Sequence, residues 1–126
     1  MQRKFAGTGA IVMLVAVALG AFGAHILEPQ IGEKAIGTYE TGVHYHMIHG
    51  IAMILAAIAA GLGLDQKRLL WANRLFLSGI ILFSGSLYLL AITGWKWLGP
   101  ITPLGGVSFI VGWLMFAMAL LKKEKH

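Results

Sequence analysis

Four long apolar runs, separated by short polar breaks, dominate the chain. They extend over residues 5–26, 39–64, 69–92 and 101–121. Each run reaches the roughly 20 residues that an α-helix needs to cross a hydrocarbon core about 30 Å thick. Backbone groups in lipid must pair internally, and the runs lack the alternating pattern of about ten residues that marks a transmembrane barrel strand. The pattern therefore predicts an all-α, antiparallel bundle of four transmembrane helices.

The composition also indicates a membrane protein. Of the 126 residues, 58% are hydrophobic and 12% are charged, and the mean hydropathy is +0.78. Soluble domains are about 45–50% apolar and about 25% charged. A chain this short cannot bury such an excess of apolar surface. We therefore expect residues 1–126 to form a single integral membrane domain, multi-pass in the plasma (inner) membrane and surrounded by membrane lipids.

Basic residues gather on one side of the predicted bundle. The termini and the second break hold eight of the ten, and the first and third breaks hold one each. The positive-inside rule then places both termini and the second break in the cytoplasm. The inner residues are Arg3, Lys4, Lys67, Arg68, Arg74, Lys122, Lys123 and Lys125, and the outer ones are Lys34 and Lys96. Since these residues mark the ends of apolar runs, we interpret them as topology signals and expect no nucleic-acid partner.

The first apolar run admits a second interpretation, a cleaved signal peptide. Arg3 and Lys4 would form its basic region, and Ala21, Phe22 and Gly23 would form a small-x-small cleavage site. The run is longer than the about 7–15 residues usual for the apolar part of such a peptide. We therefore expect it to remain in the protein as the first helix.

Polar side chains within the predicted spans concentrate in the outer half of the bundle. The inner halves are nearly pure hydrocarbon, and residues 11–19, 51–60 and 109–121 include no titratable side chain. Ionisable groups inside a membrane are costly and are by default hypotheses of function. We therefore predict an outer-half polar pocket for a lipid headgroup, a small solute or a proton. Its ligand-binding candidates are His25, Tyr45, His49, Ser84, Ser86 and Tyr88.

The histidines also raise the question of a metal site. His46 and His49 lie three residues apart and, with His25, could bind protons or a transition metal. A closed metal site needs three or four oriented ligands, and no carboxylate clearly shares their helix face. We therefore expect no metal and no cofactor. The structural alternative is that His44 and His46 are interfacial and that His49 hydrogen-bonds to a neighbouring helix.

Signatures of catalysis are missing from the sequence. It contains no phosphate-binding glycine loop with a lysine, no nucleophile elbow, no His-Glu-x-x-His motif and no cysteine. We therefore expect a non-enzymatic protein that binds a ligand. The alternatives are a small transporter or channel, working as a homo-oligomer, and a structural or assembly protein. Ridges of small residues such as Ala16, Gly20 and Ala24 would suit close packing within one chain or between copies.

Four segments, in order, resemble a known family. They are ALGAFGAH (18–25), TGVHYHMIHG (41–50), LFSGSLYLL (82–90) and ITPLGGVSFIVGW (101–113). Together they resemble the YgdD/YwdK family of small bacterial membrane proteins, a domain of unknown function, over essentially the whole chain. The resemblance implies a four-helix plasma-membrane protein without an established activity. It marks as motif positions Gly20, Gly23, His25, Gly42, Tyr45, His49, Ser84, Gly85, Ser86, Tyr88, Pro103, Gly105 and Gly106.

Overall fold

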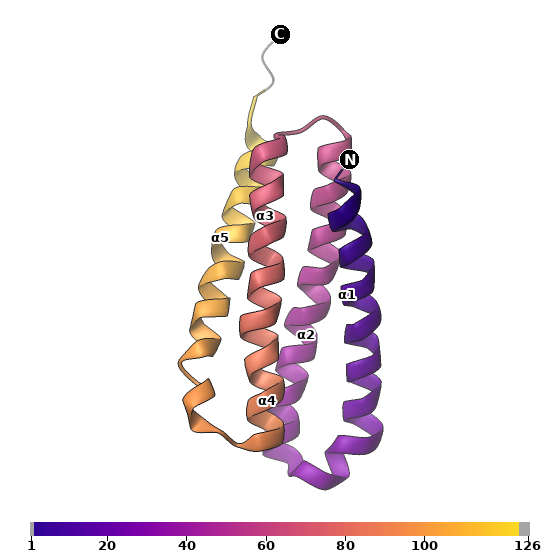
Figure 1. The fold of residues 1–126 in the computed structure, drawn as a ribbon, viewed down its shortest axis with the longest axis vertical. Coiled ribbons are helices and arrows are strands. Elements are labelled where there is room, and N and C mark those ends of the chain that lie inside the picture. Colours follow the sequence, from indigo (N-terminus) through magenta and orange to yellow (C-terminus); the bar gives the residue numbers. More distant parts are fainter. Residues whose placement is uncertain (1, 124–126) are drawn as a thin grey trace.

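A computed structural model describes residues 2–123, and all regular structure in this range is helical (Figure 1). The all-α prediction is therefore confirmed, while Lys125, used above for orientation, lies outside the described residues. The elements in chain order are α1 (Arg3–Phe22), the π-helical turn η1 (Gly23–Leu27), α2 (Glu28–Gly61), α3 (Gln66–Gly79), the π-helical turn η2 (Ile80–Ser84), α4 (Gly85–Thr93), the 3₁₀ turn η3 (Lys96–Leu98) and α5 (Ile101–Leu121).

The prediction of four separate helices is not what the structure shows. Within residues 2–123, three continuous helical stretches are long and apolar enough to cross a membrane, namely Arg3–Gly61, Gln66–Thr93 and Lys96–Leu121. The predicted first break is itself helical. Its backbone stays helical from α1 through η1 to Glu28, whose N–H donates to the Gly23 carbonyl, and Pro29 follows in the first turn of α2. Helix α2 therefore begins at Glu28 rather than near Tyr39.

The first stretch reverses its direction at Gly32. The backbone there has φ 86° and ψ 169°, which glycine adopts readily and residues with a side chain do not. The two arms on either side of Gly32 then run side by side in opposite directions (Figure 1). They approach closely, since a Cβ added to Gly9 would lie 3.0 Å from the carbonyl oxygen of Gly50. A single glycine thus folds 59 continuous residues into a hairpin.

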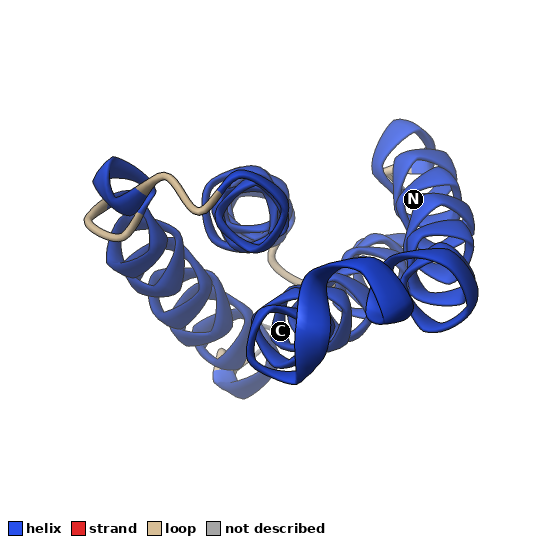
Figure 2. Ribbon diagram, turned by 90° about the horizontal axis from the view of Figure 1, so that it is seen from below, coloured by secondary structure: helices blue, strands red, loops and turns tan. Residues whose placement is uncertain are grey.

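Viewed along their length, the helices form a bent row (Figure 2). Helix α1 packs on α2, α5 packs on α3, and the contact between α2 and α3 joins the two pairs. On α2, Ala52, Ala56 and Ala60 are all buried in the core that α2 shares with α3 and α5. Small residues spaced by four allow this close approach of helices. The arrangement leaves much of α1 and α5 facing outward.

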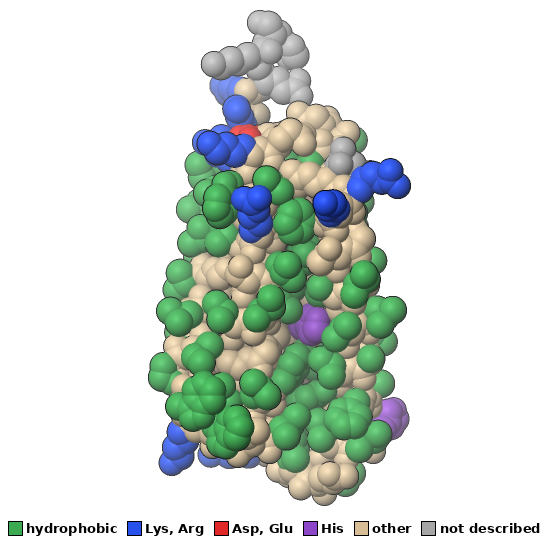
Figure 3. Space-filling model, viewed as in Figure 1, with side chains coloured by type: hydrophobic (Ala, Val, Ile, Leu, Met, Phe, Trp, Pro, Cys, Tyr) green, Lys and Arg blue, Asp and Glu red, His purple; other side chains and the backbone are tan. Residues whose placement is uncertain are grey.

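The outward surface is apolar along its middle and basic at its ends (Figure 3). Ile11 and Leu14 on α1 and Ile110 and Leu114 on α5 are each 56–69% exposed. Contiguous apolar surface of this kind is unfavourable in water and is typical of helices that contact lipid. The surface therefore fits a multi-pass membrane protein.

Candidate functional site

His49 is buried at the centre of an aromatic cluster between α2, α3 and α5, in which Phe76 and Phe109 are also buried and Trp113 is 41% exposed. Its ring is 3% exposed and stacks on Phe109, with centroids 3.6 Å apart and planes 10° from parallel. The indole Nε1–H of Trp113 donates to His49 Nε2 over 2.9 Å. Because indole nitrogen can only donate, Nε2 must be the acceptor and Nδ1 carries the proton. Nδ1–H then donates to the Tyr45 carbonyl at 2.7 Å, so both ring nitrogens have partners.

A second buried polar cluster joins α2 to η2 and α4. His46 Nδ1 and the Tyr88 hydroxyl lie 2.8 Å apart in hydrogen-bonding contact, and the ring of Tyr88 packs against Tyr39 at 5.0 Å. The Tyr39 hydroxyl donates to the Leu19 carbonyl on α1 at 2.6 Å. Ser84, with 0% exposure, donates to the Gly42 carbonyl at 2.7 Å. These contacts tie three helices together through their side chains.

The remaining predicted site residues are spread out. Ser86 is buried and shares a hydrogen bond of 2.6 Å with Thr102 on α5. Tyr45 is 41% exposed and its ring packs on Phe83. His25 is exposed on η1. The structure therefore brings together four of the six candidates in interhelical contacts and leaves His25 and Tyr45 at the surface.

The structure does not bring His25 together with His46 and His49, the grouping that the sequence raised as a question and that we did not expect to bind a metal. Within residues 2–123, no group of three His, Cys, Asp or Glu side chains is placed to hold a metal ion. His25 belongs to η1, whereas His46 and His49 lie well inside α2, three residues apart and on the same side of the helix. Their partners, Tyr88 and Trp113, come from α4 and α5 respectively.

One buried polar residue, Asn73, is absent from the candidates drawn from the sequence. Asn73 on α3 is 0% exposed, and neither its amide nitrogen nor its amide oxygen has a hydrogen-bonding partner among the described residues. Its neighbours along the helix face, Leu69 and Phe76, are part of the apolar core. The sequence signal was present, because Asn73 falls on the same helical face as Leu69, Phe76 and Ile80.

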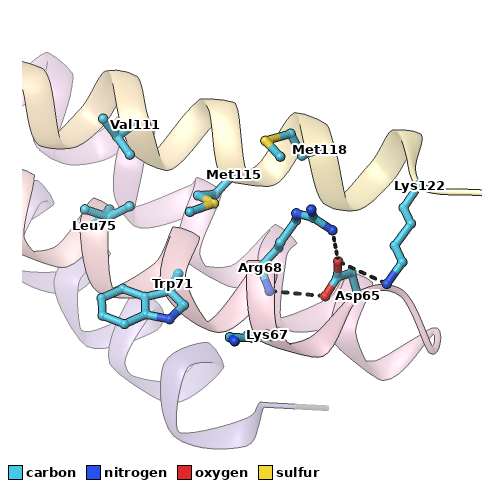
Figure 4. Close-up of a pocket in the computed structure, with 9 residues that line it drawn as sticks. All are labelled: Asp65, Lys67, Arg68, Trp71, Leu75, Val111, Met115, Met118 and Lys122. Atoms are coloured by element: carbon cyan, nitrogen blue, oxygen red, sulfur yellow. Dashed lines mark hydrogen bonds and ion pairs between the residues drawn. The ribbon is translucent and has the colours of Figure 1, made fainter.

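A groove at the basic end of the molecule was also missed (Figure 4). It has a volume of about 770 Å³ and lies between α3 and α5. Lys67, Arg68 and Lys122 line its mouth together with Asp65, and its wall is apolar. In the sequence these cations indicate only the topology of the chain. Their spacing could not show that the end of α5 lies beside the start of α3.

Asp65 organises the mouth of the groove by capping α3. Its Oδ1 accepts the backbone N–H of Arg68 at 3.2 Å, and its Oδ2 lies 2.7 Å from Arg68 Nη1 and 3.6 Å from Lys122 Nζ. The hydrogen bond from the side chain of Arg68, and to a smaller extent the one from its backbone N–H, hold the pKa of Asp65 below its ordinary value. A carboxylate at this position also favours the positive end of the helix dipole.

Asp65→Asn is expected to lower the melting temperature at neutral pH and to flatten its acid dependence. Because the pKa of Asp65 is lower in the folded state, its stabilisation is fully present above the unfolded value, about pH 4. It is lost as the pH falls through the folded-state pKa. Melting temperatures of both proteins in detergent, from about pH 7 down to about pH 3, measure the difference. Parallel acid profiles for the two proteins would contradict this role.

Comparisons with known proteins identify relatives over most of the chain. Residues 19–106 match the model of a family described as "Protein of unknown function (DUF423)". "UPF0382 membrane protein YwdK" of Bacillus subtilis is 47% identical over 121 residues, covering 96% of this chain and 98% of that protein. "UPF0382 membrane protein SAB0533" of Staphylococcus aureus is 43% identical and "UPF0382 membrane protein SH2409" of Staphylococcus haemolyticus is 41% identical, with the same coverage. No solved structure matches.

Proposed function

Since the chain belongs to the family described as "Protein of unknown function (DUF423)", whose description assigns no activity, we propose from its own geometry that it is a non-enzymatic membrane scaffold. The resemblance read from the four sequence motifs is confirmed, and the protein is a multi-pass membrane protein. The scaffold acts through its outer surface, toward lipid or a partner, rather than through an internal polar site.

The observation that carries this proposal is how the buried polar side chains are used. Of the five buried polar residues that the structure describes, all except Asn73 hydrogen-bond to another side chain or a carbonyl. These four, His46, His49, Ser84 and Ser86, are each at most 5% exposed. Inside a membrane such bonds hold helices together. A histidine whose two nitrogens both have partners, as in His49, has no free nitrogen for a solute. This supports a structural use of the residues first considered as a ligand pocket.

The scaffold crosses the membrane four times in this proposal, with both termini in the cytoplasm. The stretch Arg3–Gly61 is 59 residues long, so as a straight helix it would measure about 90 Å, three times the hydrocarbon core. The reversal at Gly32 gives two crossings from this one stretch. The excess of Lys and Arg at the two ends of the chain and in the first half of α3 sets the orientation.

Cysteine labelling tests the topology directly, because the chain has no cysteine of its own. Single substitutions Lys34→Cys, Leu62→Cys, Lys96→Cys and Lys123→Cys are introduced, and a membrane-impermeant maleimide is added to intact cells; Leu62 is chosen in the turn after α2 because it is 75% exposed and has a negative φ. We expect labelling of the cysteines at positions 34 and 96 from outside, and of those at 62 and 123 only after permeabilisation. Opposite accessibility of positions 34 and 96, or protection of position 34, would overturn the four-crossing arrangement.

Flux measurements test the scaffold role against transport. Purified protein is reconstituted into liposomes, and the movement of protons, K⁺ and Zn²⁺ is recorded. The scaffold predicts the same leak as in protein-free liposomes. His25→Ala and Tyr45→Phe probe the two surface candidates of the outer-half pocket without touching the buried contacts. If the wild-type protein gives flux above this leak, and either variant lowers that flux without lowering the melting temperature, the protein is a transporter and the scaffold proposal is wrong.

A further inference from the structure

We propose that the groove between α3 and α5 binds one anionic phospholipid, with its headgroup at the basic mouth and an acyl chain along the apolar wall (Figure 4). The volume of about 770 Å³ falls within the range of about 300–1,000 Å³ that ligand sites in proteins occupy. The site adds a specific ligand to the scaffold and does not depend on the outer-half residues.

Charge at the mouth selects an anion. Lys67, Arg68 and Lys122 bring three positive charges against the single negative charge of Asp65. Asp65 is already paired, with Arg68 at 2.7 Å and more loosely with Lys122 at 3.6 Å. The side chains of Arg68 and Lys122 remain 38% and 54% exposed, so N–H groups are open to a further acceptor. A phosphate diester supplies that acceptor and balances the excess positive charge.

The wall of the groove provides for an acyl chain. It is formed by Leu75 on α3 and by Val111, Met115 and Met118 on α5. From Lys122 to Val111 the helix rises about 16 Å, which is close to the half-thickness of a hydrocarbon core about 30 Å across. Methionine side chains adapt to a flexible ligand. A soluble anion would use the mouth and leave this wall uncovered, so the depth of the apolar wall favours a lipid.

Trp71 marks the level at which headgroup and chain meet. It lines the groove one turn along α3 from Arg68 and is 44% exposed. Tryptophan is enriched at the membrane–water interface, where its ring lies at headgroup level. Basic pockets between helices on the cytoplasmic side are suited to anionic headgroups. Along the groove, the cations, Trp71 and the apolar wall therefore follow one another in the same order as the headgroup, the interfacial region and the acyl chain of a phospholipid.

Lipid-dependent melting temperatures test the proposal on the intact protein in neutral detergent. Phosphatidylglycerol is titrated, with phosphatidylcholine as the neutral reference and inorganic phosphate as the soluble one. We expect phosphatidylglycerol alone to raise the melting temperature. The double variant Lys67→Gln/Lys122→Gln should bind it roughly 25-fold more weakly, about fivefold for each cation removed. Arg68 is left in place because it holds the cap of α3.

The matched control removes the same charge at the same end of the molecule, outside the groove. Arg3 and Lys4 are exposed on α1, whose start reaches the first turn of α3 through a hydrogen bond from Gln2 to the Gln66 carbonyl. Arg3→Gln/Lys4→Gln should weaken binding by less than about threefold, since these cations lie outside the site and are screened. Equal losses in the two double variants would overturn the groove in favour of general surface attraction.

A second variant and a second signal locate the acyl chain. Val111→Phe narrows the apolar part of the groove without changing the cations. It should weaken phosphatidylglycerol binding and leave the melting temperature in phosphatidylcholine near that of the wild type. Phosphatidylglycerol with a brominated chain should quench tryptophan fluorescence, and Trp71→Phe should remove that part of the quenching. If inorganic phosphate raised the melting temperature as much as phosphatidylglycerol does, the groove would be a site for a soluble anion and the lipid proposal would be wrong. A dimer that forms without lipid and is broken by Lys67→Gln/Lys122→Gln would identify a second copy as the occupant instead.

Discussion

Gly105→Ala is expected to destabilise the protein by about 3 kcal/mol or more, at the upper end of overpacking effects. A Cβ at Gly105 would collide with the backbone nitrogen of Phe83 and come within 2.7 Å of its Cα. Backbone atoms cannot rotate away as a side chain can, so α5 would have to move off η2. Unfolding by sodium dodecyl sulfate in mixed micelles, followed by circular dichroism, measures the change.

The adjacent glycine is the matched control. A Cβ at Gly106 would meet only Cδ2 of Phe83, at 3.9 Å, which is ordinary van der Waals contact. Gly106→Ala should therefore be neutral or stabilise α5 by up to about 1 kcal/mol, the difference in helix propensity. Similar losses in both variants would contradict the close approach of α5 to Phe83. Gly85, one of the motif positions of the family resemblance, meets nothing within 4 Å and should tolerate alanine.

His49→Ala is expected to destabilise by about 2–4 kcal/mol, the range for removal of a large core side chain. The change removes a ring stacked 3.6 Å from Phe109 and leaves the indole N–H of Trp113 without its acceptor. An unpaired donor adds to the loss, because no water in a packed membrane interior replaces the bond. The same unfolding assay measures it.

A double-mutant cycle isolates the contribution of the hydrogen bond. Trp113→Phe keeps an aromatic ring and removes the N–H donor, and it should cost about 1 kcal/mol. The loss of unfolding free energy in the double variant should be smaller than the sum of the two single losses by about 0.6–1.7 kcal/mol, the range from the average to the largest coupling measured for hydrogen bonds between membrane helices. Additive effects, or His49→Ala without loss of stability, would contradict the role of His49 as a link between α2 and α5.

The sequence by itself determined that the protein is helical and lies in a membrane. Lipid leaves no alternative for a long apolar run, so the runs at 69–92 and 101–121 correspond closely to Gln66–Thr93 and Ile101–Leu121. The first break could not be predicted in the same way. Pro29, Gly32 and nearby charges are typical of a loop, yet helical hydrogen bonds can form on both sides of one glycine. The structure places the reversal in that single residue.

Residue type also indicated that His49, Ser84 and Tyr88 matter, since polar groups inside a membrane need partners. Only the tertiary structure determines which residues those partners are. Trp113 lies 64 residues from His49, and Lys122, at the end of α5, meets Asp65 at the start of α3. Helical periodicity defines the faces of α3 but not which of them meets α5. The packing of the helices determines which faces meet. It places polar residues from different helices in contact, and it brings cations from α3 and the end of α5 to one groove.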